Sequence, residues 1–306
     1  MNVDISIVVV NYNTSALTRK CIESINRYVP ANLSYEIIVV DNNSKFEDYI
    51  DLTNSVETAS GLKMIRNRKN LGFAGGFMTG ALRANGNFLF FVNSDVLVIE
   101  DSFTPFVTLM NAQTDIGVCG GQVLTCEYKH EKSFDHFITF GYKVLGPWLY
   151  EKMYPGKKSR TKEYFEPIDV DMTHGCYMVF RKKYFDEVGG LDDNIFLYYE
   201  EMDICKRLLK KGHRVVMEPR TKIVHLGGAS TPKNMLIKKE LLISYLYVLQ
   251  KNFGVFQFLL AHVFLSVVFF FKSIVKPKYF SIFFMLLFHG NGLTKSLKHK
   301  QKISPA

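Results

Sequence analysis

Three acidic side chains stand within four residues at the start of a predicted helix over residues 200–211. The stretch 198–203 reads YYEEMD, which places acids at Glu200, Glu201 and Asp203. On a helix, Glu200 and Asp203 share one face, whereas Glu201 points about 100° away from them. A carboxylate beside aromatic side chains is suited to take a proton from a hydroxyl group. The helix dipole alone also favours acids here, so a general base and a stabilised helix start are both open.

A fourth acid, Asp95, follows five apolar residues, FLFFV, at positions 88–92. Such a run predicts a buried strand, so the segment Asn93-Ser94-Asp95 projects from a rigid sheet edge. Hard divalent cations take oxygen ligands and bind well between a carboxylate and diphosphate oxygens. Because Asp and Asn after a strand also form turns, the segment alone leaves a metal site and a turn both open.

Two glycine-containing segments offer further candidates. Residues 70–76 read NLGFAGG and lead into a predicted helix over 73–84. Glycines permit close backbone approach and a helix N-terminus favours an anion, but the segment is neither a P-loop nor a G-x-G-x-x-G fingerprint. A packing turn and a ligand site are therefore both open. His225 follows a β-like stretch over 221–224 and precedes Gly227 and Gly228, a pattern compatible with a structural histidine and with a ligand.

The elements that must position these residues alternate along the first hundred residues. The alternation predicts an α/β fold with a mostly parallel, Rossmann-like sheet and helices on both faces. In such sheets ligands bind beyond the carboxyl ends of the strands, which is where Asn11, Asp41 and Asp95 fall. Residues 122–167 mix aromatics, lysines and glycines without a period, and we expect loops there that cover one side of a site. The predicted strands cover 5–10, 36–40, 62–65 and 88–92, and the predicted helices 14–28, 46–57 and 73–84.

The composition indicates a globular chain in a reducing compartment. With 306 residues, of which 47% are apolar, the chain can build one large domain or a domain with an appendage. Its five cysteines are odd in number and lack zinc-finger spacing, which fits the cytoplasm. The N-terminal MNVDISIVVV has neither the basic flank nor the long apolar run of a signal peptide.

The charge excess is concentrated at the C-terminal end. From position 232 onward there are 11 lysines and one acid, Glu240, whereas the preceding part holds 27 basic and 28 acidic residues. Residues 253–271 carry no charge, and as a helix they would extend about 28 Å, near the bilayer hydrocarbon thickness of about 30 Å. The polar residues of this region share one half of a helical wheel, which favours a helix in the membrane interface. They are Gly254, Gln257, His262, Ser266, Lys272 and Ser273.

We therefore predict apolar and amphipathic C-terminal helices in residues 231–306, attached to a membrane in an interfacial or re-entrant manner. Pro277 breaks the first apolar run, and residues 279–288 begin a second. A true span and a buried pair of helices in a soluble protein are the alternatives. A basic tail also suits nucleic acid, but the apolar character of this one favours a membrane surface, and we expect no nucleic-acid partner.

Taken together, these motifs resemble the family 2 glycosyltransferases of the GT-A fold, especially the bacterial rhamnosyltransferase-like branch. The matching segments occur in the family's order over roughly residues 5–230. They are residues 8–13 (VVVNYN), 39–44 (VVDNNS), 70–76 (NLGFAGG), 93–95 (NSD), 188–192 (VGGLD), 196–203 (FLYYEEMD) and 225–230 (HLGGAS). The resemblance implies a GT-A catalytic domain over 1–230, with a nucleotide-binding half to about residue 100 and an acceptor-binding half after it.

The same resemblance implies residue roles in an inverting transfer from a nucleoside diphosphate sugar. Asn93 replaces the first acid of the family's Asp-x-Asp motif, as in this branch, so binding of Mg²⁺ or Mn²⁺ would rest on Asp95, with His225 as a second ligand. Glu201 aligns with the second acid of the Glu-Asp motif that marks the base. That acid is Glu here rather than Asp, so Glu200 stays a candidate. The nucleotide-sugar site would comprise Val10, Asn11, Asn13, Asp41, Arg66, Asn70, Gly75, Asn93 and Ser94, and the acceptor site Gly175, Cys176, Tyr199 and Asp203.

The implied partners are a dTDP- or UDP-linked sugar and a lipid-linked saccharide, at the cytoplasmic face of the cell membrane. Rhamnose from dTDP-rhamnose is the donor that the branch suggests, in cell-surface polysaccharide synthesis. The alternatives are another sugar from a UDP donor and a non-catalytic, membrane-bound carbohydrate-binding protein. The four acids argue against the latter. A nucleotidyltransferase is disfavoured because residues 8–14 lack its basic, Gly-rich signature.

Overall fold

The structure, a computed structural model, describes residues 3–56, 62–227 and 234–304. Its strands are β1 (Ile5–Asn11), β2 (Tyr35–Asp41), β3 (Leu62–Arg66), β4 (Phe88–Asn93), β5 (Val96–Val98), β6 (Ile116–Leu124), β7 (Phe134–Asp135), β8 (Ile168–Asp169), β9 (Met172–Thr173), β10 (Tyr177–Arg181) and β11 (Arg214–His225). Its α-helices are α1 (Ser15–Tyr28), α2 (Phe46–Val56), α3 (Gly72–Ala81), α4 (Thr104–Ala112), α5 (Phe140–Met153), α6 (Lys182–Glu187), α7 (Glu200–Lys210), α8 (Met235–Phe253), α9 (Val255–Val275) and α10 (Phe280–His289). Short 3-10 helices lie at Pro277–Tyr279, Leu293–Lys295 and Leu297–Lys300.

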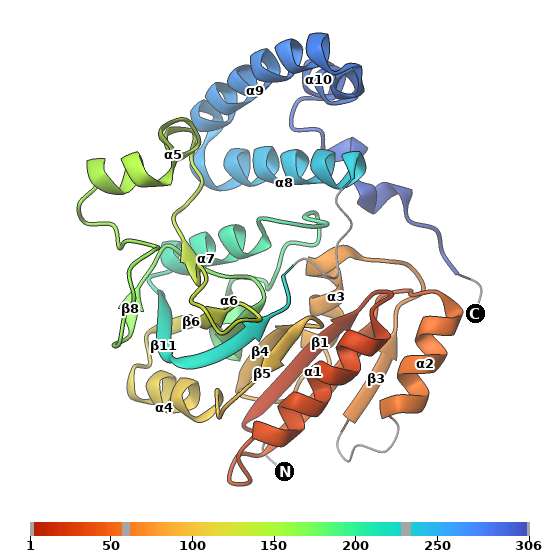
Figure 1. The fold of residues 1–306 in the computed structure, drawn as a ribbon, viewed down its shortest axis with the longest axis vertical. Coiled ribbons are helices and arrows are strands. Elements are labelled where there is room, and N and C mark those ends of the chain that lie inside the picture. Colours follow the sequence, from red (N-terminus) through yellow and green to blue (C-terminus); the bar gives the residue numbers. More distant parts are fainter. Residues whose placement is uncertain (1–2, 57–61, 228–233, 305–306) are drawn as a thin grey trace.

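A nine-stranded mixed sheet forms the centre of the fold, and helices cover both of its faces (Figure 1). The strand order is β3-β2-β1-β4-β10-β6-β11-β5, and β8 pairs with β11 beside this path. The strands β3, β2, β1 and β4 are parallel to one another. Beyond β4 the sheet is mixed, because β10 runs antiparallel to β4 and β6, and β5 runs antiparallel to β11. The expected α/β architecture with helices on both faces is confirmed.

The parallel half of the sheet is built from the apolar runs of the sequence. Along β1, Ile5, Ile7 and Val9 belong to the core on the side of α1 and α2, whereas Val8 packs against α3 on the other face. Burial on both faces explains why these strands read as continuous apolar runs rather than as alternating ones. The parallel register places Asn11 opposite Asp41 at the carboxyl ends of β1 and β2, where the sequence predicted a ligand site.

The expected loop region, residues 122–167, contains the helix α5, so the prediction of loops is wrong for part of it. The helix is interrupted at Gly146, where φ is 71°, and Pro147 follows. The kink divides α5 into two short pieces, so no continuous apolar stripe marks it in the sequence. Residues 154–167 do lie outside helices and strands.

The C-terminal helices form a layer above the sheet in Figure 1. Helix α8 packs on α7 and buries Tyr245 and Leu246 completely, so it is part of the main core. Helix α9 packs on α8, and α10 packs on α9. By length and composition alone, α9 is the one described helix that could cross a membrane. The division of the chain near residue 230 falls in a stretch, residues 228–233, that lies outside the described residues, as do Gly228 to Ser230 of the predicted motif.

Three polar residues of α9 contact the protein, and a large part of its apolar surface is exposed. The Gln257 Oε1 accepts a hydrogen bond from the backbone N–H of Phe140 at 3.0 Å, His262 Nε2 lies 2.9 Å from the carbonyl oxygen of Leu286, and Ser273 is buried. The polar half of the helical wheel is therefore divided, because Gln257, His262 and Ser273 contact the protein whereas Gly254 and Lys272 are exposed. The exposed apolar face of α9 and α10 comprises Val255, Phe256, Leu259, Val263, Phe264, Val267, Phe270, Phe271, Ile274, Val275, Phe280, Phe284, Leu287 and Phe288.

Candidate active site

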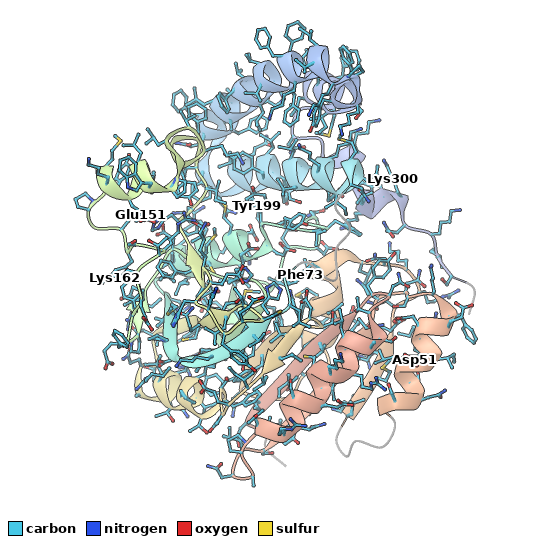
Figure 2. All side chains as sticks on the ribbon, viewed as in Figure 1. Asp51, Phe73, Glu151, Lys162, Tyr199 and Lys300 are labelled. Carbon is cyan, nitrogen blue, oxygen red and sulfur yellow. The ribbon has the colours of Figure 1, made fainter. Side chains whose placement is uncertain are left out.

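A cleft of about 600 Å³ lies at the carboxyl ends of β1 and β4. The start of α3, the start of α7 and the C-terminal segment also contribute to its walls. In Figure 2, the labelled Phe73 and Tyr199 lie between α8 and the sheet, whereas Asp51 and Lys162 lie at the periphery. Ten of the residues singled out from the sequence line the cleft: Val10, Asn70, Asn93, Ser94, Asp95, Gly175, Cys176, Glu200, Glu201 and His225.

The adjacent carboxyls Glu200 and Glu201 both face this cleft. They follow Tyr198 and Tyr199, which hold positive φ angles of 71° and 69°. Two successive left-handed residues without glycine are unfavourable and persist only where the surrounding packing enforces them. The backbone N–H of Tyr198 donates to Glu200 Oε1 at 3.0 Å. The strained turn therefore fixes the carboxyl pair at the first residues of α7.

The pKa values of both carboxyls are raised above the ordinary value of glutamate. Burial, followed by the charge of Glu201, raises the pKa of Glu200 strongly, and burial also raises the pKa of Glu201. A side-chain hydrogen bond joins the two carboxyls, and it stabilises the proton on Glu200 and the charge on Glu201. Two neighbouring buried carboxyls cannot both ionise easily. The pair is therefore suited to hold one proton and one negative charge between its two carboxyls.

The second acidic element of the cleft is Asp95, which follows β4 and is almost completely buried. His225, at the end of β11, places its Nε2 3.4 Å from Asp95 Oδ1. A carboxylate and an imidazole that converge at this separation fit Mg²⁺ or Mn²⁺, which are held by few protein ligands and complete their coordination with water and phosphate oxygens. Within the described ranges, no group of three or more His, Cys, Asp or Glu side chains has metal-site geometry.

A second histidine, His174, lines the same part of the cleft. Its ring centroid lies 5.6 Å from that of His225. Burial, followed by the charge of His225, lowers the pKa of His174 to about 4, so its ring is neutral near pH 7. The backbone N–H of Cys176 lies 3.2 Å from His174 Nδ1 and donates to it, which leaves the ring proton on Nε2. His174 is thus a neutral hydrogen-bond donor in the cleft.

The turn before α3 is organised by the buried side chain of Asn42. Its Nδ2 donates to Asn70 Oδ1 at 3.0 Å and to the carbonyl oxygen of Gly72 at 2.9 Å. Gly72 has a φ of 75°, and a Cβ there would lie 2.1 Å from the carbonyl oxygen of Phe196. The first N–H groups of α3 already donate to protein, from Gly72 to Asn70 Oδ1 and from Phe73 to the Phe196 carbonyl. This glycine therefore serves close packing, which brings the turn and residue 196 together at the cleft wall.

Three predicted nucleotide-site residues form a network beside the cleft rather than in its lining. Asn11 and Asp41 are fully buried, and Asn11 Nδ2 donates to Asp41 Oδ2 at 3.0 Å. Arg66 Nε lies 3.4 Å from Asp41 Oδ1, and its guanidinium stacks over Tyr49 at 4.0 Å. Ser44 joins the network through its backbone N–H, which donates to Asp41 Oδ1 at 3.2 Å. These contacts fix the turn after β2, which carries Asn42 into the cleft.

The other predicted residues also lie outside the lining. Asn13, with a φ of 56°, accepts a hydrogen bond from the Lys45 backbone at 2.8 Å. Gly75 packs inside α3, where a Cβ would lie 2.6 Å from the Cβ of Leu71. Tyr199 packs against Tyr245 on α8, at 5.4 Å between ring centroids.

Asp203 is fully buried and turned toward α8. It receives hydrogen bonds from Arg207 and Asn252, and Lys251 Nζ lies 2.8 Å from its Oδ1. These contacts join α7 to α8 and hold the helix that carries the carboxyl pair.

Several lining residues were not singled out from the sequence. Seven of them lie inside the quoted segments 8–13, 39–44, 70–76 and 196–203 without having been assigned to the site, and His174 directly precedes Gly175, so these motifs were the available signal. Others come from distant segments whose role only the fold reveals. The lining residues missed are Tyr12, Thr14, Asn42, Gly72, Phe73, Phe77, His174, Phe196, Leu197, Tyr198, Ile237, Leu297 and Gln301.

Comparisons with known proteins identify the family of the chain. The sequence matches the model of the family "Glycosyl transferase family 2" over residues 6–189. Polypeptide N-acetylgalactosaminyltransferase 3 of Drosophila melanogaster is 24% identical over 241 residues, which cover 74% of this chain and 35% of that protein. Rhamnosyltransferase WbbL of Escherichia coli is 23% identical over 228 residues, covering 72% of this chain and 82% of that one. The chain thus spans about a third of the length of the fly protein.

A solved structure extends the likeness to nearly the whole chain. The mannosyltransferase PcManGT from Pyrobaculum calidifontis, solved with GDP-Man and Mn²⁺, has a TM-score of 0.57 at 15% identity. The match covers 98% of this chain and 88% of that one. At this identity the likeness concerns the fold.

Proposed function

Because the chain belongs to glycosyl transferase family 2 and has the GT-A fold, we propose that it transfers a sugar from a nucleoside diphosphate donor to a hydroxyl group of an acceptor. This proposal rests on one observation: two pairs of side chains line the same cleft. One pair is Glu200 with Glu201, and the other is Asp95 with His225. The carboxyl pair suits removal of a proton, and the second pair suits a divalent cation beside diphosphate oxygens.

In the proposed reaction Glu201 acts as the general base. It takes the proton from the acceptor hydroxyl while that oxygen forms a bond to the anomeric carbon of the donor. The bond from the anomeric carbon to the diphosphate oxygen breaks on the opposite side, so the configuration at this carbon is inverted. General-base assistance of this kind is worth about 10²–10⁴ in rate.

The remaining groups of the cleft support this step. Glu200, which holds the proton of the pair, donates to Glu201 and keeps its charged oxygen in place. Asp95 and His225 would hold Mg²⁺ or Mn²⁺, which when bound offsets the charge that develops on the leaving diphosphate. The neutral His174 supplies a further donor near these oxygens. Tyr198 and Gly175 lie beside the carboxyl pair, where the acceptor would approach.

For the substrates, we propose a dTDP- or UDP-linked sugar and a lipid-linked saccharide, with rhamnose from dTDP-rhamnose as the first donor to test. The likeness to the E. coli rhamnosyltransferase supports this choice. The exposed apolar face of α9 and α10 supports a membrane surface as the place of work, because an aqueous environment disfavours a continuous apolar surface of this kind. Lys272 lies in the last turn of α9, and Lys276 and Lys278 lie between α9 and α10, where they suit anionic lipid headgroups at the cytoplasmic face.

A thermal-shift screen against nucleotide sugars, with and without Mn²⁺, tests the proposed function. A ligand at 100 times its Kd stabilises the folded state by about 2.7 kcal/mol, which corresponds to about 5 °C for a chain of this size. We expect at least one dTDP- or UDP-sugar to give such a shift, dependent on Mn²⁺, in the wild type but not in Asp95→Ala. If the screen finds no shift at all, the proposed donor class is wrong.

The runner-up is a transferase of another sugar from a UDP donor. The same screen separates this case from the first, because a UDP-sugar would then stabilise the protein and dTDP-rhamnose would not. A non-catalytic carbohydrate-binding protein would bind a saccharide without releasing nucleoside diphosphate from any donor.

A further inference from the structure

Residues 296–304, here called the C-terminal strap, return from the apolar helices to the nucleotide-binding half of the chain. Figure 1 shows this segment descending from α10, past the end of α8, to the side of α2, an element that is distant from it in sequence. The strap belongs to residues 231–306, which the sequence predicts to associate with a membrane. Its contacts indicate a different role.

Specific hydrogen bonds hold the strap to α8 and to the loop before α7. Glu240 of α8, which is 1% exposed, accepts from the Ser296 hydroxyl at 2.6 Å and from the backbone N–H of Leu297 at 2.8 Å. Lys298 Nζ donates to the backbone oxygen of Asp193 at 2.8 Å and to its Oδ2 at 3.1 Å. A buried carboxylate whose two oxygens both bind the same segment fixes its path.

The far end of the strap is held by the turns after β2 and β3. The Ser304 hydroxyl donates to Asn43 Oδ1 at 2.6 Å, and the Ser304 backbone N–H donates to the carbonyl oxygen of Arg68 at 2.7 Å. Asn43 adjoins Asn42, and Arg68 lies two residues before Asn70, so the strap ends beside the turns that form the nucleotide end of the cleft.

Between these anchors, Leu297 and Gln301 enter the lining of the cleft. Gln301 Nε2 donates to the Leu297 carbonyl at 2.9 Å, which orients its carboxamide. A carboxamide has two N–H donors and an acceptor oxygen, so one internal bond leaves capacity for a ligand. An apolar and a polar side chain together suit a nucleoside, whose flat base needs an apolar wall and whose polar edge and ribose hydroxyls need hydrogen bonds.

We infer that the C-terminal strap forms a wall of the nucleoside subsite, in which Leu297 covers the nucleoside and the Gln301 carboxamide hydrogen-bonds to it. This inference rests on the proposed function and assigns part of donor binding to a segment outside the family match, which ends at residue 189. The nucleoside is the part concerned because the strap is anchored beside Asn43 and Arg68, whereas Asp95 and the carboxyl pair lie beyond β4 and at the start of α7.

Calorimetric titration of the full-length chain with UDP and with dTDP, each with MnCl₂, tests the inference. Gln301→Ala should weaken binding of the preferred nucleotide about threefold to tenfold, the effect of losing one good hydrogen bond. A chain ending at Lys300 keeps both anchors to α8 and the loop before α7, and it should bind at least tenfold more weakly. Lys302→Gln is the matched control, because this exposed side chain lies on the same strap outside the lining. It should stay within twofold of the wild type.

The outcomes separate this inference from its alternatives. It is supported if Gln301→Ala weakens UDP or dTDP binding while the melting temperature without ligand stays within about 2 °C of the wild type. It is overturned if both Gln301→Ala and the chain ending at Lys300 bind the nucleotides within twofold of the wild type, because the strap is then only structural. A parallel titration with a nucleotide sugar adds a further test: if binding weakens only for the nucleotide sugar and not for the free nucleotide, the inference is overturned, since the strap would then contact the sugar. If the wild type binds neither nucleotide, the proposed function fails first, and this inference fails with it.

Discussion

Replacing Glu201 by glutamine should remove the base and leave the shape of the cleft unchanged. The carboxyl of Glu201 lies beside Gly175, where even an added Cβ would be 3.7 Å from Glu201 Oε2, so the amide fits the same space. We expect kcat to fall about 100-fold or more, which corresponds to about 2.7 kcal/mol of transition-state stabilisation. The Kd of the donor nucleotide should be nearly unchanged, because the side chain acts on the acceptor hydroxyl.

Glu200→Gln is the matched control at the neighbouring position. Burial and the charge of Glu201 raise the pKa of Glu200 well above its usual range, which favours the neutral form of this side chain. Glutamine keeps an acceptor for the Tyr198 N–H and a donor for Glu201. We therefore expect most of kcat to survive and the acceptor KM to change more than kcat.

The pH dependence follows from the direction of the pKa shift. The base must be ionised, and burial raises the pKa of Glu201 above its usual value of about 4.3. Activity should therefore be lost as pH falls through this raised value, at a higher pH than an exposed glutamate would give. The acid limb of kcat/KM should persist in Glu200→Gln.

The assay is release of nucleoside diphosphate with a soluble acceptor analogue, with donor affinity measured separately by calorimetry. The assignment is refuted if Glu200→Gln abolishes kcat while Glu201→Gln keeps most of it, since the two roles must then be exchanged. If neither substitution matters, the base is elsewhere, and Asp203 or Asp171 would be tested next. Both of these are held in ion pairs, Asp203 with Arg207 and Asp171 with Lys157, which makes them poorer bases.

Four further predictions concern the metal, the nucleotide turn, the membrane and the stability of the carboxyl pair. Asp95→Ala should lose nearly all transfer and all response to Mn²⁺ while keeping its melting temperature, and full activity of this variant in EDTA would exclude the proposed site. Asp41→Ala should raise the donor KM more than it lowers kcat. It should also cost about 1–3 kcal/mol of stability, because Asn11 and Ser44 lose the carboxylate to which they donate hydrogen bonds. A change confined to the KM of the sugar acceptor would contradict this prediction. The double variant Val263→Lys, Val267→Lys should be released from anionic vesicles in a sedimentation assay. The control Leu82→Lys, at an exposed position within the first hundred residues of the chain, should stay bound. Equal sedimentation of the double variant and the control would place the anchor elsewhere. Glu200→Gln should raise the melting temperature at pH 8 but not at pH 4. A carboxyl whose pKa is raised in the folded state makes the protein less stable as pH rises from about 4.3 through that raised pKa, by about 1.4 kcal/mol for each unit between the folded and unfolded pKa values. An equal change at both pH values would argue against a buried pair.

Much of the structure of the first hundred residues could be predicted because its signals are local. The strands β1, β2 and β4 are short apolar runs, and each ends at the polar residues that the sequence singled out, namely Asn11, Asp41 and Asn93. Strand ends fix where such residues lie in a parallel sheet. Sequence alone could not show which of them enter the cleft, and Asn11 and Asp41 instead support the turn that carries Asn42.

The chain beyond about residue 122 was harder to predict because many of its contacts are with residues distant in sequence. The kink at Gly146 removes the period of α5. The sequence also does not show that Gln257 and His262 of α9 bind the backbone of Phe140 and Leu286. The strap gave no signal of its own: Gln301 lines the cleft only because Glu240, Asp193 and Asn43 hold the segment across it.

The central claim, sugar transfer from a nucleoside diphosphate donor with Glu201 as the base, is tested most directly by one measurement. The purified full-length chain and its Glu201→Gln variant are each incubated with a panel of dTDP- and UDP-sugars, MnCl₂ and a lipid-linked saccharide. Two quantities are then determined: the released nucleoside diphosphate and the anomeric configuration of the product. The account predicts release from one donor with inversion at the anomeric carbon, reduced about 100-fold or more in Glu201→Gln. Release at equal rates by both proteins, or a product with retained configuration, would contradict it.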